Sequence, residues 1–288
     1  MLKKILFAMD GSENAERALP WIKQYAGPET AQVVLFRAVD TKDLDKEFCA
    51  RELQDARNYL QRFEKELNYS GLPTKMIVRE GKPAPEIVRT AIKEGCELIL
   101  MTTRGGSKVR RWLTGGVTEQ VLRISPIPVL CVRSQTALPK QGHVRRVIVP
   151  LDGSKLAEDV VPWAKKLARF LKARLIFLHV SSAGPNGTGF RAEENFDALR
   201  KRMVYLIARL KDQGVNAAFR LQRGDAADRI LKFVDRNDLV VTTTHGFGGF
   251  KRWVFGSVAE KLIHMARIPV LVYKTLAQAN SKALVEAS

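Results

Sequence analysis

The residues best suited to chemistry lie in a glycine-rich stretch near the end of the chain. Gly246 and Gly249 follow the short apolar run 239–241, and Gly256 and Ser257 then precede apolar residues at helical spacing. Unpaired N–H groups at a helix N-terminus attract anions, and glycines let a phosphate approach the backbone closely. The stretch therefore indicates a phosphate cradle, although an ordinary strand-to-helix turn would use glycine in the same way.

The same pattern occurs a second time, 141 residues earlier in the chain. Residues 98–120 correspond to residues 239–261, which matches Gly105 with Gly246, Gly115 with Gly256 and Val117 with Val258. The same offset joins Val39 to Val180, and an offset of 142 joins Asp10 to Asp152. Because a repeat of this length is that of a domain and is too long for a solenoid unit, the sequence predicts a duplicated domain.

The elements that must position these residues alternate between strands and helices in each half. This order is typical of a parallel sheet with helices on both faces. We expect two domains, 1–136 and 144–288, joined by a polar linker at 137–143. The expected strands are 5–9, 33–39, 75–79, 98–102 and 129–132 in the first half, and 144–149, 175–180, 217–222, 239–243 and 270–273 in the second.

The first helix of each half carries two further signals. Ser12 is expected to cap the N-terminus of the first helix, since its hydroxyl can accept a hydrogen bond from a free backbone N–H group. Pro20 lies inside that helix, and Pro162 lies at the matching place in the second half. Because proline removes a helical hydrogen bond, we expect a kink or a restart at both positions.

Composition narrows the classes of function. The net charge of +18 favours anionic partners, but no motif for sequence-specific nucleic-acid binding accompanies it. The three cysteines show no C-x-x-C spacing, so the sequence supports neither a disulfide framework nor a zinc site, and a reducing cytoplasm fits best. The N-terminal apolar run ends at Asp10, which is too early for a membrane span or a signal peptide.

A doubly wound sheet binds ligands beyond the carboxyl ends of its strands, where the strand order reverses. If the first strand lies beside the fourth, Asp152 faces the loop that ends at Ser257, and Val180 lies beside it. A carboxylate at one end of this crevice and N–H groups at the other can hold a polar base or sugar with a phosphate tail. The crevice is therefore expected to bind a nucleotide.

The strand ending in Asp-Gly-Ser, the duplication and the G-x9-G-S loop followed by Val-x-Glu together resemble a tandem universal stress protein. The resemblance covers nearly the whole chain. It implies two tandem α/β domains, each a doubly wound five-stranded parallel sheet in the order 3-2-1-4-5 with helices on both faces. It also implies an adenine nucleotide, ATP or AMP, with Mg²⁺ as an optional counter-ion.

The resemblance further assigns roles to individual residues. Asp152 and Val180 would contact the adenine, and the glycine loop would contact the ribose and phosphates; the second-domain candidates are Asp152, Val180, Thr243, Gly246, Gly249, Gly256, Ser257 and Val258. The weaker first-domain set is Asp10, Val39, Gly105, Gly115, Gly116 and Val117. The nucleotide-binding pattern G-x2-G-x9-G-[S/T] is imperfect in both copies, because Thr102 and Thr243 replace its first glycine. Since Gly116 also replaces the phosphate-binding serine, we expect nucleotide chiefly in the second domain.

These features favour a cytoplasmic stress-response protein that binds the nucleotide as a ligand and passes that state to an unknown protein partner. There is no Walker or Rossmann glycine motif, and no second carboxylate or lysine completes a phosphoryl-transfer set. We therefore expect no enzyme, or at most a slow ATPase. The competing hypothesis is a scaffold or apolar-ligand carrier that has lost its nucleotide, as Thr102, Thr243 and Gly116 would suggest.

The last strand of each half, 129–132 and 270–273, bears on assembly. Universal stress proteins commonly dimerise through this strand, so the resemblance implies an internal pseudo-dimer within one chain. Such apolar edges would otherwise favour aggregation. The sequence leaves a homodimer of two chains open.

Overall fold

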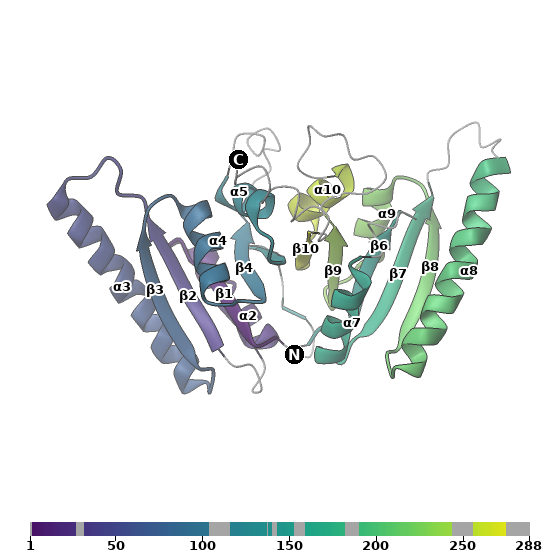
Figure 1. The fold of residues 1–288 in the computed structure, drawn as a ribbon, viewed down its shortest axis with the longest axis horizontal. Coiled ribbons are helices and arrows are strands. Elements are labelled where there is room, and N and C mark those ends of the chain that lie inside the picture. Colours follow the sequence, from purple (N-terminus) through teal and green to yellow (C-terminus); the bar gives the residue numbers. More distant parts are fainter. Residues whose placement is uncertain are drawn as a thin grey trace. The chain divides into compact units, whose positions relative to one another are not determined.

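The computed structural model describes residues 2–26, 32–103, 116–136, 138–139, 143–152, 159–181, 190–243 and 256–274. The chain divides into two compact units, one built on Met1–Leu138 and the other on Pro139–Thr275. Each unit is an α/β body with its own parallel sheet (Figure 1). The predicted fold class is therefore confirmed, whereas the predicted borders at residues 136 and 144 stay predictions.

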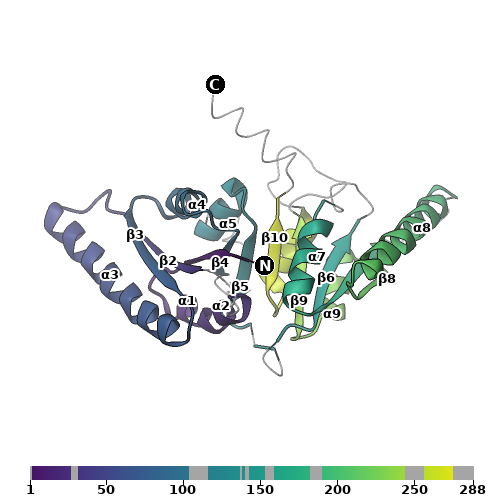
Figure 2. The ribbon, with the colours of Figure 1, turned by 60° about the horizontal axis from the view of Figure 1, so that its bottom comes forward.

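The first unit is a doubly wound domain. Its sheet has the strand order β3-β2-β1-β4-β5, with parallel pairing throughout. Figure 2 shows α4 and α5 on one face of this sheet and α1, α2 and α3 on the other. Its elements are β1 (Lys4–Ala8), α1 (Glu13–Glu16), α2 (Leu19–Tyr25), β2 (Gln32–Val39), α3 (Lys46–Tyr69), β3 (Thr74–Glu80), α4 (Pro83–Lys93), β4 (Leu98–Thr103), α5 (Val117–Ile124) and β5 (Val129–Arg133).

The second unit repeats this plan. Its strand order is β8-β7-β6-β9-β10, which is the same 3-2-1-4-5 arrangement. The helices α9 and α10 pack against each other, as α4 and α5 do in the first unit. Its elements are β6 (Arg146–Leu151), α7 (Val161–Phe170), β7 (Arg174–Ser181), α8 (Phe190–Asp212), β8 (Ala217–Arg223), α9 (Ala226–Phe233), β9 (Asp238–Thr243), α10 (Ser257–Met265) and β10 (Val270–Tyr273).

The helix after the first strand breaks where the prolines predicted. The Ser12 hydroxyl accepts a hydrogen bond from Ala15 N and so caps α1, as expected. Helix α1 ends at Glu16, and the chain restarts as α2 at Leu19, with Pro20 in the first turn, where its missing N–H has no partner to lose. Pro162 has the same place in the first turn of α7.

The long helices bury one apolar stripe each. On α3 the buried positions are Ala56, Leu60, Phe63 and Leu67, spaced by three and four residues. Apolar residues of the central strands lie beneath the helices and are almost completely inaccessible to water. These layers leave the carboxyl ends of the strands as the edge at which polar residues gather.

The central strands of the first unit separate before they end. Pairing between β1 and β4 runs from Ile5 and Leu98 to Phe7 and Leu100. However, β1 continues to Ala8, and β4 continues to Thr103. At this point β1 pairs only with β2, and β4 pairs only with β5. The separation marks the place where strand order reverses, which is where doubly wound sheets bind ligands.

The second unit shows the same separation, and a proline lies within it. Pairing between β6 and β9 stops at Ile148 and Val240, whereas β6 runs on to Leu151. Pro150 pairs with Leu178 of β7 and has no partner in β9. Proline is tolerated there because no ladder hydrogen bond is required on the β9 side. The strand predicted at 144–149 therefore lies two residues further along, at Arg146–Leu151.

The hydrogen bonds at the ends of the second strands correct one predicted equivalence. Gly81 N donates to Val39 O over 2.8 Å, and Gly224 N donates to Ser181 O over 3.0 Å. The two glycines share a left-handed backbone, with φ of +128° and +129°. Ser181, and not Val180, therefore occupies the position of Val39. The match of Val39 with Val180 was wrong by one residue, because the two copies differ by 142 residues here, as they do at Asp10 and Asp152.

Candidate functional site

The start of α10 in the second unit offers free backbone donors. Gly256 is the N-cap residue of α10 and has an extended backbone, and no side chain caps the helix among the described residues. Ser257, the first helical residue, is exposed to solvent. Figure 1 shows α10 at the end of the unit toward which the β6 and β9 arrowheads point. The N–H groups of the first turn can therefore bind an anion in this region.

The matching helix of the first unit is tied to its strand by a side chain. Gly116 is the N-cap residue of α5 and, like Gly256, has an extended backbone without a side-chain cap. The Thr118 hydroxyl donates to Thr102 O, at the end of β4, over 3.3 Å. This contact places the N-terminus of α5 beside the open end of the sheet. The predicted helix starts at Gly116 and Ser257 are confirmed to within one residue.

The turn after β1 holds the first-domain carboxylate in a fixed position. Asp10 Oδ1 accepts hydrogen bonds from Ser12 N over 2.9 Å and from Ser12 Oγ over 2.5 Å. Gly11 lies between them with φ of +85°, a conformation that side chains disfavour. Asp10 is exposed, and Asp152 is likewise exposed directly after β6. Both carboxylates therefore lie at the carboxyl edge of their sheets, as predicted.

Sequence reasoning missed a cation beside Asp10. Arg37, on β2, extends over Gly11 so closely that a Cβ atom there would lie 2.9 Å from Arg37 Nη1. The guanidinium also lies over the ring of Tyr59 on α3, with 5.2 Å from Cζ to the ring centroid. Burial, followed by the charges of Glu16 and Asp10, raises the pKa of Tyr59. An arginine therefore fills the space beside the first-domain turn.

The second domain has a histidine at the equivalent strand position. The same register that matches Ser181 with Val39 matches His179 with Arg37. His179 Nδ1 lies 2.8 Å from Leu151 O, in the residue just before Asp152. Because a carbonyl only accepts, Nδ1 carries the proton in this contact. The two crevices therefore differ in the basic group beside their carboxylate, a difference that strand periodicity alone did not reveal.

The remaining predicted residues divide into those that the structure places and those beyond its described part. Val180 and Thr243 are half-buried near the ends of β7 and β9, Val39 is buried at the end of β2, and Val117 and Val258 lie in the first turns of α5 and α10. Four loop glycines lie outside the described residues: Gly105, Gly115, Gly246 and Gly249. The phosphate loops themselves therefore stay predictions.

Other reactive groups lie away from these crevices. The three cysteines are free thiols; Cys49 is half-buried, whereas Cys96 and Cys131 are buried. Burial raises the pKa of Cys96 to about 11 and that of Cys131 to about 12, so both thiols stay protonated at neutral pH. Within the described ranges, no group of three or more His, Cys, Asp or Glu side chains could hold a metal ion. None of the helices in those ranges is long and apolar enough to cross a membrane.

Comparison with known proteins decides the family. The model of the universal stress protein family matches residues 1–133 and again residues 143–274. The chain belongs to the universal stress protein family. It carries two tandem domains of that family, as the sequence predicted.

Relatives support this assignment over one domain and over both. Universal stress protein MJ0577 of Methanocaldococcus jannaschii is 30% identical over 159 residues, which is 48% of this chain and 98% of the relative. A universal stress protein of Mycolicibacterium smegmatis is 23% identical over 288 residues, covering 94% of this chain and 96% of the relative. The crystal structure of a universal stress protein from Archaeoglobus fulgidus has a TM-score of 0.75 and 22% identity, covering 94% of this chain and 96% of its own. The structural match shows that the fold is shared.

Proposed function

We propose that this universal stress protein binds an adenine nucleotide, ATP or AMP, as a ligand, chiefly in its second domain. The observation that carries the proposal is the N-terminus of α10, which no described side chain caps and which lies at the end of the unit where β6 and β9 separate. Its N–H groups and the positive end of the helix dipole suit a phosphate. Asp152, exposed after β6, suits a hydrogen-bond donor of the base or sugar.

The preference for the second domain rests on two differences. Ser257 offers a hydroxyl where the first domain has Gly116, and a lost hydrogen bond of this kind costs about 1 kcal/mol. In the first domain, Arg37 also lies against Gly11 and occupies space beside Asp10. Both differences make the first crevice the poorer fit for the same ligand.

Calorimetric titration of the full chain with ATP and AMP tests the proposal. A carboxylate at the first turn of each helix forms a matched pair of variants, Ser257→Glu and Val117→Glu. Glutamate favours a helix N-terminus, so both proteins should fold, but its charge repels phosphate. We expect Ser257→Glu to abolish the tighter binding and Val117→Glu to leave it. The reverse pattern would refute the second-domain preference, and no binding heat in the wild type would refute nucleotide binding.

The competing function is a scaffold or carrier of an apolar ligand. Thr243 favours it, since a half-buried side chain stands where the nucleotide-binding pattern has glycine. A thermal shift assay separates the two functions, because a ligand at about 100 times its dissociation constant stabilises a protein by about 2.7 kcal/mol. No shift with millimolar ATP or AMP, together with a lipid in the mass spectrum of the purified protein, would favour the carrier.

We propose a cytoplasmic stress-response protein whose nucleotide state is read by a protein partner, with Mg²⁺ as an optional counter-ion of the phosphates. We also propose that the nucleotide is not consumed, or at most slowly. Phosphate release well above the buffer background, with ATP bound, would contradict this.

An internal pseudo-dimer through the last strands, and a homodimer of chains, stay predictions that light scattering and strand-edge variants can check.

A further inference from the structure

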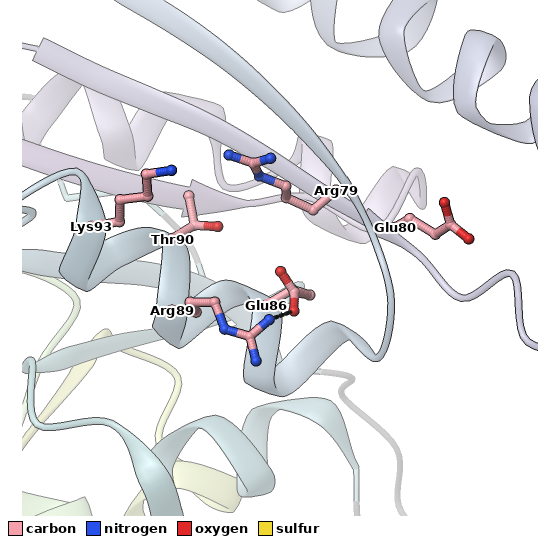
Figure 3. Close-up of a pocket in the computed structure, with 6 residues that line it drawn as sticks. All are labelled: Arg79, Glu80, Glu86, Arg89, Thr90 and Lys93. Carbon is pink, nitrogen blue, oxygen red and sulfur yellow. Dashed lines mark hydrogen bonds and ion pairs between the residues drawn. The ribbon is translucent and has the colours of Figure 1, made fainter.

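A charged pocket lies in the first unit, away from the crevice between β1 and β4. It lies between the edge strand β3 and the helix α4, and its volume is about 370 Å³. Its lining residues are Arg79, Glu80, Glu86, Arg89, Thr90 and Lys93. Figure 3 shows the Arg79 and Lys93 side chains reaching toward the same part of the pocket, with Thr90 between them in this view and Glu80 directed away.

The two carboxylates of the pocket are already engaged. Glu86 forms an ion pair with Arg89, one turn further along α4. Glu80 Oε1 accepts a hydrogen bond from Thr41 Oγ1 over 2.5 Å. One cation and one carboxylate are therefore neutralised within the pocket, and the other carboxylate bonds to a hydroxyl outside it.

The two remaining cations have no such partner. Neither the Arg79 nor the Lys93 side chain forms a hydrogen bond or a close ion pair with a residue in the described part of the chain. The charge of Lys93 lowers the pKa of its neighbour Glu94 without a close contact between the two side chains. Glu94 instead forms an ion pair with Lys75 over 2.8 Å. Two positive charges directed into one pocket repel each other, and an anion between them would remove that repulsion.

The chemistry of these groups selects the kind of anion. Arginine presents a planar set of N–H donors that matches phosphate oxygens, and lysine adds a point charge. A phosphate monoester carries a charge of roughly −1.5 to −2 at pH 7 and three acceptor oxygens, which suits two cations and a hydroxyl. A pocket of 370 Å³ accommodates a small ligand, and its charged lining excludes an apolar one. We propose that Arg79, Lys93 and Thr90 bind the phosphoryl group of a small phosphate monoester.

Residue-resolved NMR of the full chain tests this site, with inorganic phosphate and glycerol 3-phosphate as the probes. The amide signals of Thr90 and Lys93 belong to α4 in the first unit, so phosphate bound at the start of α10 in the second unit does not interfere. We expect saturable shifts at both amides. Arg79→Gln and Lys93→Gln should each weaken binding about tenfold or more, since each removes a charge-assisted hydrogen bond.

Two further variants make the test specific. Lys82 is the exposed N-cap residue of α4 and does not line the pocket. Lys82→Gln therefore removes one positive charge nearby and should leave binding nearly unchanged. Glu86→Gln removes a negative charge and frees Arg89, so it should tighten binding. An absent shift at Thr90, or equal weakening by Lys82→Gln, would overturn the proposal. Because it concerns a different pocket, it can fail while adenine nucleotide binding succeeds, and the reverse also holds.

Discussion

The ion pair at the start of β6 and β9 allows a sharp test of what joins the two central strands of the second unit. Arg146 and Asp238 are direct cross-strand partners. Arg146 Nε donates to Asp238 Oδ1 over 2.7 Å, and Nη2 donates to Oδ2 over 2.5 Å. Asp235 N also donates to Asp238 Oδ2, over 2.8 Å. The Asp238 side chain is completely buried, whereas 29% of the Arg146 side chain is exposed.

The expected effect of Asp238→Asn follows from this burial. The variant keeps the shape of the side chain but removes its charge. The half-buried Arg146 guanidinium is then left with the exposed Asp235 carboxylate and the Phe233 carbonyl as acceptors. Breaking a fully buried pair costs about 3 to 5 kcal/mol, and an exposed pair contributes about 0 to 1 kcal/mol. Because Arg146 is partly solvated, we expect a loss of about 2 to 3 kcal/mol in the free energy of unfolding.

Urea denaturation of the full chain, followed by a probe in each domain, measures this loss. Lys261→Gln is the matched control in the same domain, since its ion pair with Asp228 lies at the surface, and it should change stability by less than about 1 kcal/mol. A destabilisation by Asp238→Asn no larger than that of the control would refute the reasoning. It would mean that hydrogen bonding alone, and not charge, holds the pair.

Three further predictions concern the first domain. Gly11→Ala should destabilise it by about 1 to 2 kcal/mol in the same assay, because the new Cβ meets Arg37 and the backbone has positive φ; Gly71→Ala, with similar φ and open space, isolates the backbone contribution. Since burial raises the pKa of Cys131 from 9.0 to about 12, stability from the neutral thiol is present below pH 9 and is lost as pH rises toward 12. Stability should therefore fall less between pH 8 and pH 11 in Cys131→Ala than in the wild type, and equal slopes would contradict this. At neutral pH, Cys49 should react first with a thiol reagent, as peptide mapping can show.

The sequence predicted the fold well because its strongest signals are local. Short β-branched strands, the cap at Ser12 and the proline in each first helix report on the backbone near them, and all agree with the structure. The strand order came from the resemblance to a known family, since no local signal states which strands are neighbours. The crevices follow from that order.

The finer features of the sites depend on contacts between distant residues. The match of Val39 with Val180 failed because one offset was applied to a repeat whose offset varies between elements. Arg37 was missed because its role depends on the space that Gly11 leaves and on Tyr59 of α3. The phosphate loops remain predictions because their glycines lie outside the described residues.

Pro150 affects whether the strands on either side of the second crevice can pair further and close it. In the first unit, Met9 N donates to Phe36 O of β2, so the preceding amide, that of Ala8, is directed toward β4. Pro150 takes the place of Ala8 in β6, as their partners in β2 and β7 show. Pro150 has no N–H group to donate to β9. The pairing of β6 with β9 therefore cannot extend by one more hydrogen bond when the crevice is empty. The crevice of the second unit is thus kept apart at this position because one backbone N–H group is missing.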